Sequence, residues 1–107
     1  AILSNMTSQT LANNAIYDTG IPRKSVGYLF VKHYNQGYIN GSLYSIGFNM
    51  NANNGVQRLE GGAAFNGNVK DENKFNVYCE SSGNVCVQNI SGASVTFDIG
   101  FFGVYID

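Results

Sequence analysis

Charged side chains are scarce in this chain of 107 residues. They make up 12% of it, about half of the ~25% that is usual in globular proteins. The six Lys and Arg residues are scattered, so the sequence has no basic stripe with which to neutralise nucleic-acid phosphates. It also lacks any run of about 20 apolar residues, the length that a membrane-spanning helix needs. We therefore expect neither nucleic-acid binding nor membrane insertion.

Patterns that carry catalysis are missing as well. The sequence has no Gly-x-Ser-x-Gly elbow, phosphate loop or dinucleotide fingerprint. The only histidine, His33, stands at the end of an expected strand, where a surface position is a simpler explanation than a general base. Two cysteines and one distant histidine fall short of the four ligands of a structural metal site. We predict that the protein is not an enzyme and uses no cofactor or metal.

The seven acidic residues are also scattered, so they form no obvious catalytic pair. Asp98 is the exception in position, because it lies between Phe97 and Ile99 in an apolar strand. Either a solvated alternate face of that strand or a buried pair at a subunit contact would explain it.

Helical periodicity is absent, and short strand-like segments separated by Asn and Gly take its place. Fifteen Asn and thirteen Gly punctuate the chain, and the Tyr, Phe and Val between them favour strands. We expect strands at 11–18, 25–34, 38–50, 56–60, 63–69, 74–80, 85–90 and 94–106. About seven to nine strands at this spacing predict an all-β fold, an antiparallel, jelly-roll-like β-sandwich. Residues 1–107 form one domain in this prediction, the C-terminal domain of a longer chain.

Two of the expected strands are apolar on both faces. In 25–34 and 100–106, bulky apolar residues occupy alternating positions, although a small sandwich has only one core. Phe101 and Phe102 point to opposite faces of a regular strand, so we predict an oligomer interface around Phe101, Phe102 and Val104. The alternatives are a central strand covered on both faces within one subunit, or cover by residues 1–11.

The two cysteines, Cys79 and Cys86, flank a short loop. If residues 81–84 form a four-residue hairpin loop, Cys79 lies directly opposite Cys86, near enough for a disulfide. Two buried thiols that simply pack together would satisfy the same register.

A glycan site would need an exposed aromatic ring with amide and hydroxyl groups beside it. The residues around one expected turn match this requirement best: Tyr34, Asn35, Gln36, Tyr38, Asn40 and Tyr44. Turn tyrosines that cap the edge of the core are the competing interpretation. Three Asn-x-Ser/Thr sequons begin at Asn5, Asn40 and Asn89, and they matter only in a eukaryotic secretory pathway.

Three segments of the second half stand out together: residues 73–78 (Asn-Lys-Phe-Asn-Val-Tyr), residues 83–92 (Gly-Asn-Val-Cys-Val-Gln-Asn-Ile-Ser-Gly) and the aromatic terminal strand. In these segments the chain resembles the C-terminal head domains of phage tail fibres and receptor-binding proteins. Residues 27–32 (Gly-Tyr-Leu-Phe-Val-Lys) resemble an upstream strand of such heads, so the likeness spans about residues 17 to 107. It is a style of sequence, and no binding residue is carried over from it.

The resemblance implies a trimeric sandwich at a fibre tip, on the virion, that binds a host-surface glycan or protein receptor. A cysteine pair able to form a disulfide departs from it, because phage proteins assemble in a reducing cytoplasm. A secreted or cell-surface lectin-like domain is therefore one alternative, and a structural protein of virion assembly or decoration is another.

Overall fold

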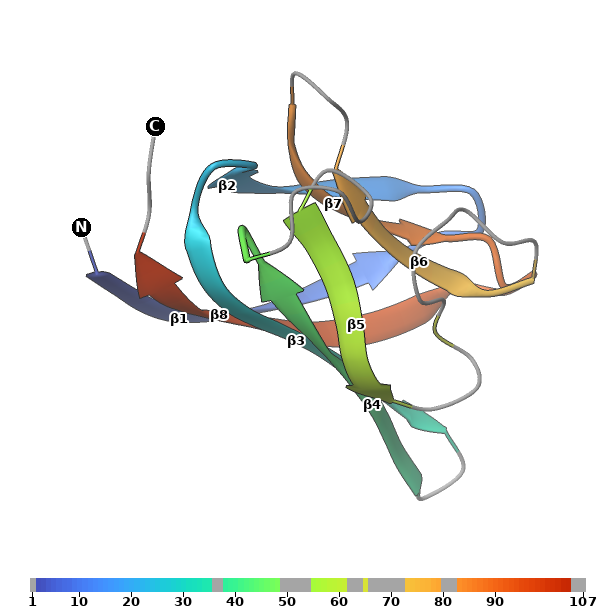
Figure 1. Ribbon diagram of the computed structural model, residues 1–107. Helices are drawn as coiled ribbons and strands as arrows, with labels where there is room; N and C mark the ends of the chain where they lie inside the picture. The colour runs from blue at the N-terminus through green and yellow to red at the C-terminus, as the bar shows by residue number, and fades with distance from the viewer. Residues whose placement is uncertain are drawn as a thin grey trace.

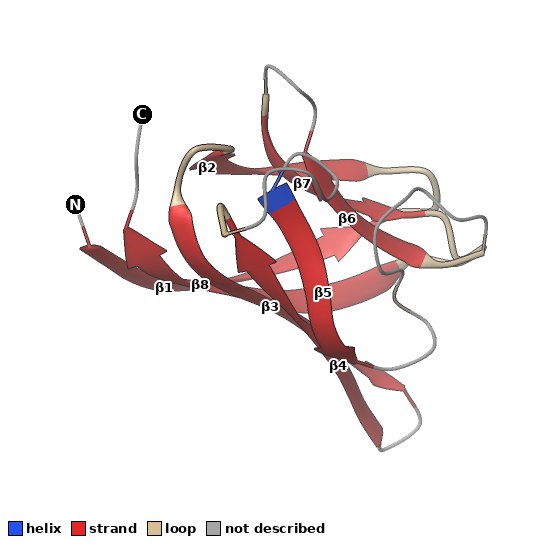
Figure 2. Cartoon of the chain, in the orientation of Figure 1, coloured by secondary structure: helices blue, strands red, loops and turns tan. Residues whose placement is uncertain are grey.

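Eight strands account for most of the residues that the structure describes. A computed structural model of the chain describes residues 2–35, 38–48, 55–61, 65, 73–79 and 83–104. The strands are β1 (Ile2–Leu11), β2 (Ile16–Pro22), β3 (Val26–Asn35), β4 (Tyr38–Ile46), β5 (Val56–Gly61), β6 (Phe75–Cys79), β7 (Asn84–Asn89) and β8 (Val95–Val104). In Figure 2, the only helical feature of the described part is a stub at Gly55. The expected all-β class is confirmed.

The strands form two antiparallel sheets (Figure 1). One sheet has five strands in the order β1-β8-β3-β4-β5, and the other has three in the order β2-β7-β6. The pairings β1–β8, β2–β7 and β4–β5 are those of an eight-stranded jelly roll. The β3–β8 pairing also belongs to that arrangement, whereas β3–β4 and β6–β7 depart from it, because in a jelly roll β3 would pair with β6 and β7 with β4. The architecture is therefore an antiparallel β-sandwich that shares part of the jelly-roll pairing.

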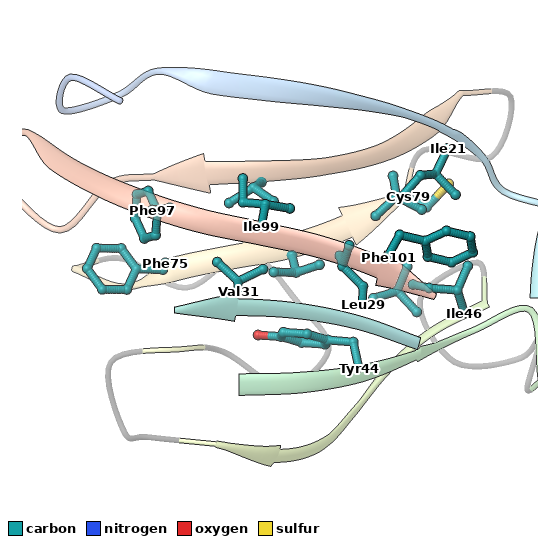
Figure 3. Packing of buried hydrophobic residues seen from close by; sticks show 14 of the residues in the cluster. Ile21, Leu29, Val31, Tyr44, Ile46, Phe75, Cys79, Phe97, Ile99 and Phe101 are labelled. Carbon is teal, nitrogen blue, oxygen red and sulfur yellow. The ribbon is translucent and has the colours of Figure 1, made fainter. Parts of the chain in front are cut away.

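Alternating side chains of the strands fill the space between the two sheets. Along β8, Phe97, Ile99 and Phe101 are buried, whereas Thr96 and Phe102 are exposed. This alternation follows because successive residues of a strand point to opposite faces of its sheet. Figure 3 shows the inward side chains of β8 meeting those of β3, β4 and β6. The core thus lies between the sheets.

Two aromatic rings lie directly on glycine backbone where β3 pairs with β8. On the inner face, Gly27 stands opposite Gly103, and a Cβ on either would come within 3.0 Å of the Phe101 ring. On the outer face, a Cβ on Gly100 would lie 2.2 Å from Cζ of Phe30. A Cβ on Gly27 or Gly103 would lie still closer to the partner strand, 2.4 Å from the Phe102 carbonyl oxygen or 2.3 Å from that of Val26, so backbone and ring together require glycine there.

A buried asparagine ties the two sheets together at one end. The Nδ2 of Asn89, in β7, donates to the carbonyl oxygen of Leu11, in β1, at 2.9 Å and to that of Ala93 at 2.7 Å. Its Oδ1 accepts from the amide of Ser91 at 3.1 Å and from the hydroxyl of Ser91 at 2.7 Å. Asn89 is fully buried, so these four bonds satisfy an amide that would otherwise be costly to bury.

The N-terminal segment differs from its expected place. We expected a first strand at 11–18 and considered residues 1–11 as cover for an apolar face. Instead β1 extends the five-stranded sheet sideways, paired with β8 from Ile2 opposite Val104 to Leu11 opposite Val95. The sequence Ile2–Leu11 contains Ser, Asn and Gln and no aromatic residue, which weakened the strand signal. Of the strand expected at 63–69, only Phe65 is described, and it bridges to Phe75 in parallel.

Candidate functional site

Four of the predicted ligand-binding residues come together at the end of the β3–β4 hairpin. In the ladder, Asn35 is opposite Tyr38, Tyr34 is opposite Ile39, and His33 is opposite Asn40. The pairing therefore gathers Tyr34, Asn35, Tyr38 and Asn40 within a few residues of the turn. Gln36, also predicted, lies outside the described residues.

This hairpin end extends beyond the sheet as a two-stranded ribbon (Figure 1). Pairing between β3 and β8 stops at His33, opposite Phe97. Pairing between β4 and β5 begins only at Ser42, opposite Gly61. Between these limits β3 and β4 pair only with each other among the described strands.

Tyr44, the sixth predicted residue, does not belong to this group, which is a correction to the sequence-based prediction. Its side chain has no exposed surface and lies in the core between the sheets (Figure 3). Burial raises the pKa of the Tyr44 hydroxyl, while a hydrogen bond with Ser42 and the positive charge of Arg58 act in the opposite direction. A ring that is covered on both sides cannot stack on a ligand. Tyr44 is two residues from Ser42 in β4, and residues two apart in a strand point to the same face, here the inner one.

Among the side chains that the structure describes, exposed aromatic rings gather on the outer face of the five-stranded sheet. Tyr28 and Phe48 stack there with their ring centroids 5.6 Å apart and their planes 30° from parallel. Phe102 is directly opposite Tyr28 in the β3–β8 ladder, and Val104 is opposite Val26 in the same ladder. We call Tyr28, Phe48, Phe102 and Val104 the outer-face patch; their side chains are 44%, 58%, 63% and 44% exposed.

The predicted interface residues divide between the two faces of β8. Phe102 and Val104 belong to the outer-face patch, whereas Phe101 is 5% exposed and packs in the core. The expectation that Phe101 and Phe102 point to opposite faces is confirmed, and Phe101 is thereby removed from any interface. Tyr28 and Phe48 were missed by sequence reasoning. The alternation of the strand could have indicated Tyr28. Its neighbour Leu29 is buried, so Tyr28 points to the opposite, outer face of the sheet.

The outer face becomes polar farther along the same strands. Asp98, partly buried, stands opposite Lys32 in the β3–β8 ladder and opposite Ser8 in the β1–β8 ladder. Next along β8, the hydroxyl groups of Thr96 and Thr10 lie 2.8 Å apart. Asp98 thus occupies the alternate face of an apolar strand, beside a cation on the next strand.

His33 is not a surface residue, contrary to the expectation. It is 6% exposed, and its ring packs edge-on against Phe75 with the centroids 4.7 Å apart. Phe97 and Phe65 flank it at 6.0 Å and 5.9 Å. Parity explains the burial, because His33 follows Leu29 and Val31 on the inner face of β3. The histidine is a member of the core.

The cysteines are not directly opposite each other, which corrects the predicted register. Cys79 pairs with Val85, and Cys86 pairs with Tyr78. This one-residue shift puts the two thiols on opposite faces of the hairpin. Cys79 is buried and Cys86 partly exposed, and the two form no disulfide. Their sulfur atoms instead lie 3.5 Å from the carbonyl oxygens of Gly83 and Asn84, respectively.

The sequon that begins at Asn89 is closed to modification, because its amide nitrogen is buried and donates two hydrogen bonds.

In the described part of the chain, no three His, Cys, Asp or Glu side chains are grouped to hold a metal ion. The same residues include no helix long and apolar enough to cross a membrane. Comparisons with protein-family models, curated proteins and solved structures find no match to this chain.

Proposed function

We propose that this domain is a non-catalytic recognition module, carried as a homotrimer at the tip of a viral fibre, that binds a host-surface glycan or protein receptor. The outer-face patch is the observation that carries the proposal. Taking ~200 Å² for each aromatic side chain, the exposed fractions of Tyr28, Phe48 and Phe102 amount to roughly 330 Å². The largest apolar patch on a typical monomer covers roughly 300–600 Å² and is often functional.

The composition of the patch supports contact with further copies of the chain. Burial of ~330 Å² of apolar surface is worth about 8 kcal/mol before the cost of association. A standard interface buries about 800 Å² on each partner, so the patch would form the apolar centre of a larger contact. Polar residues such as Lys32 and Asp98 lie farther along the same face, and they would form the rim of such an interface.

The ribbon at the end of β3 and β4 supports the receptor-binding part of the proposal. Tyr34, Tyr38, Asn35 and Asn40 stand on a projection that the outer-face patch does not include. Aromatic rings with neighbouring amides are the groups that recognise sugars. A trimer built on the patch would leave three such ribbons available for a receptor.

The cysteine geometry also supports assembly inside a cell. The apparent conflict between a disulfide and a reducing cytoplasm disappears, because Cys79 and Cys86 lie on opposite faces and form no disulfide. Cysteines without disulfides are normal for proteins that mature in that compartment.

A glycan array tests recognition. We expect specific retention of the fluorescently labelled domain on a subset of glycans and loss of that retention in Tyr38→Ala. Thr96→Ala, an exposed change on the polar end of the sheet, is the matched control and should bind normally. Retention by neither glycans nor host cells would refute the receptor-binding role.

Light scattering tests the trimer. Phe102→Asp should convert a trimer into a folded monomer, because it places a charge in the centre of the contact. Ile16→Asp is the control, since Ile16 is 53% exposed but lies in β2 of the other sheet. A wild-type monomer at micromolar concentration would refute association through the patch.

A purely structural role in virion assembly is the second candidate. It is favoured by the same patch, because Phe48, Phe102 and Val104 offer apolar contact without hydrogen-bonding groups. A trimer that binds no glycan and no host cell would support this role instead.

A further inference from the structure

The two sheets present four edges, and three of them carry features that oppose pairing with another strand. The β5 edge contains Arg58 and Glu60 and has a register shift against β4. The β2 edge contains Asp18 and Pro22, with a register shift between them. Phe65 bridges to the edge of β6. Charges, proline, bulges and local cover are the usual means by which proteins protect exposed strand edges.

The fourth edge, β1, has none of these features. Its ten residues, Ile-Leu-Ser-Asn-Met-Thr-Ser-Gln-Thr-Leu, include no charge and no proline. Its register with β8 runs without a shift from Ile2 to Leu11. Within the described part of the chain, β1 forms a ladder with β8 alone. A long, regular and uncharged edge strand offers backbone N–H and C=O groups to another strand.

We propose that this edge binds a second copy of the chain, with two β1 strands antiparallel across a two-fold axis. The two five-stranded sheets would become one continuous sheet. An axis perpendicular to the sheet keeps the outer faces on the same side, and it brings residues of equal parity opposite each other. Because β1 has no charged residue, no register of this pairing brings like charges together. A second copy therefore fits this edge without any change of sequence.

The protected edges also determine where assembly stops. Once two β1 strands pair, the new sheet ends in β5 at both sides, and β5 carries Arg58 and Glu60. The product is a closed dimer rather than a growing fibre. This contact is separate from the outer-face patch, which lies on the face of the sheet, so the inference does not depend on the proposed function.

The extent of the contact indicates a weak dimer. Ten paired residues span about 34 Å, and with a layer thickness of about 10 Å the edge buries on the order of 350 Å² per copy. This is about half of a standard interface. We therefore expect dissociation constants on the order of 100 µM, in the range of weak, transient complexes.

Sedimentation velocity of the 107-residue chain tests the inference, with Phe102→Asp as the parent so that the outer-face patch cannot contribute. Between about 10 and 500 µM we expect the monomer to convert to a dimer and to no larger species. Hydrogen exchange should show concentration-dependent protection at every second amide of β1, because alternate amides already point toward β8. If the chain stays monomeric at every concentration, the inference is wrong. That result would also be expected if the edge binds a strand of another protein instead of a second copy.

Adjacent proline variants distinguish edge pairing from other contacts. The amides of Thr7 and Ser8 point in opposite directions across β1. One of the variants Thr7→Pro and Ser8→Pro should therefore lose a bond to β8 and unfold at a lower temperature. The other should keep its circular dichroism and stability but dimerise at least tenfold more weakly. Dimerisation at parental strength by the folded variant would overturn the inference.

Discussion

The four hydrogen bonds of the Asn89 side chain lead to a quantitative prediction about stability. Asn89→Ala removes two bonds from Nδ2 to the carbonyl oxygens of Leu11 and Ala93 and two bonds to Oδ1 from Ser91. The Leu11 bond is buried, so its carbonyl oxygen would be left without that partner in the core. At ~1 kcal/mol for a buried bond and less for a partly exposed one, the loss is about 3 kcal/mol.

The asparagine at the other end of the same strand provides the control. Asn84 donates from Nδ2 to the Asp18 carboxylate at 3.1 Å, at an exposed position. We expect Asn84→Ala to cost less than ~0.5 kcal/mol, as exposed contacts usually do. Urea unfolding measures both free energies, and thermal unfolding should show a midpoint lower by roughly 12 °C or more for Asn89→Ala.

Asn89→Asp separates hydrogen bonding from volume. This variant keeps the size of the side chain but directs an oxygen, in place of Nδ2, at the carbonyl groups of Leu11 and Ala93. It should destabilise at least as much as Asn89→Ala. If the two Asn→Ala variants differ by less than ~1 kcal/mol, or if Asn89→Asp is tolerated, the account of Asn89 as the link between the sheets is wrong.

Three further predictions concern other parts of the core. Reducing agent should leave the unfolding midpoint unchanged, because Cys79 and Cys86 face away from each other; a lowered midpoint would reveal a disulfide. Burial raises the pKa of Tyr44, so its neutral form adds stability that is complete below the unfolded pKa near 10 and is lost as pH rises through the higher folded pKa. Unfolding measured from pH 8 to 12 should therefore show a steeper alkaline loss in the wild type than in Tyr44→Phe, and equal slopes would contradict this. Gly100→Ala should cost about 1–3 kcal/mol because its Cβ would meet the Phe30 ring, and adding Phe30→Ala should remove most of that penalty; additive losses would show that the ring is not the cause.

The strand content was predictable because it depends on local chemistry. Expected strands at 25–34, 56–60, 74–80 and 85–90 correspond within one residue at each end to β3, β5, β6 and β7. Each contains at least one Val, most of them alternate apolar with polar residues, and each has Asn or Gly at one end or both. The N-terminal strand was missed because Ser, Asn and Gln give little strand propensity, and pairing with ten residues of β8 supplied what the local sequence did not.

The candidate sites were less predictable because they depend on which face each residue takes. A one-residue error in the loop between Cys79 and Val85 was enough to reverse the relation of the two thiols. Tyr44 and His33 matched the residue types of a surface site, but their parity with Leu29 and other inward residues placed both in the core. Residue type alone carries no information on that choice.

The sequence by itself determined that this chain is an all-β sandwich, because short apolar segments of period two, separated by turn residues, allow little else. It also determined that Phe101 and Phe102 face opposite ways, since the geometry of a single strand requires it. Only the tertiary structure decided that Phe102 meets Tyr28 on an open face, that Asn89 joins the sheets and that β1 is the unprotected edge. These features arise from pairing between strands far apart in the chain, and such pairing is set by the packing of the whole core.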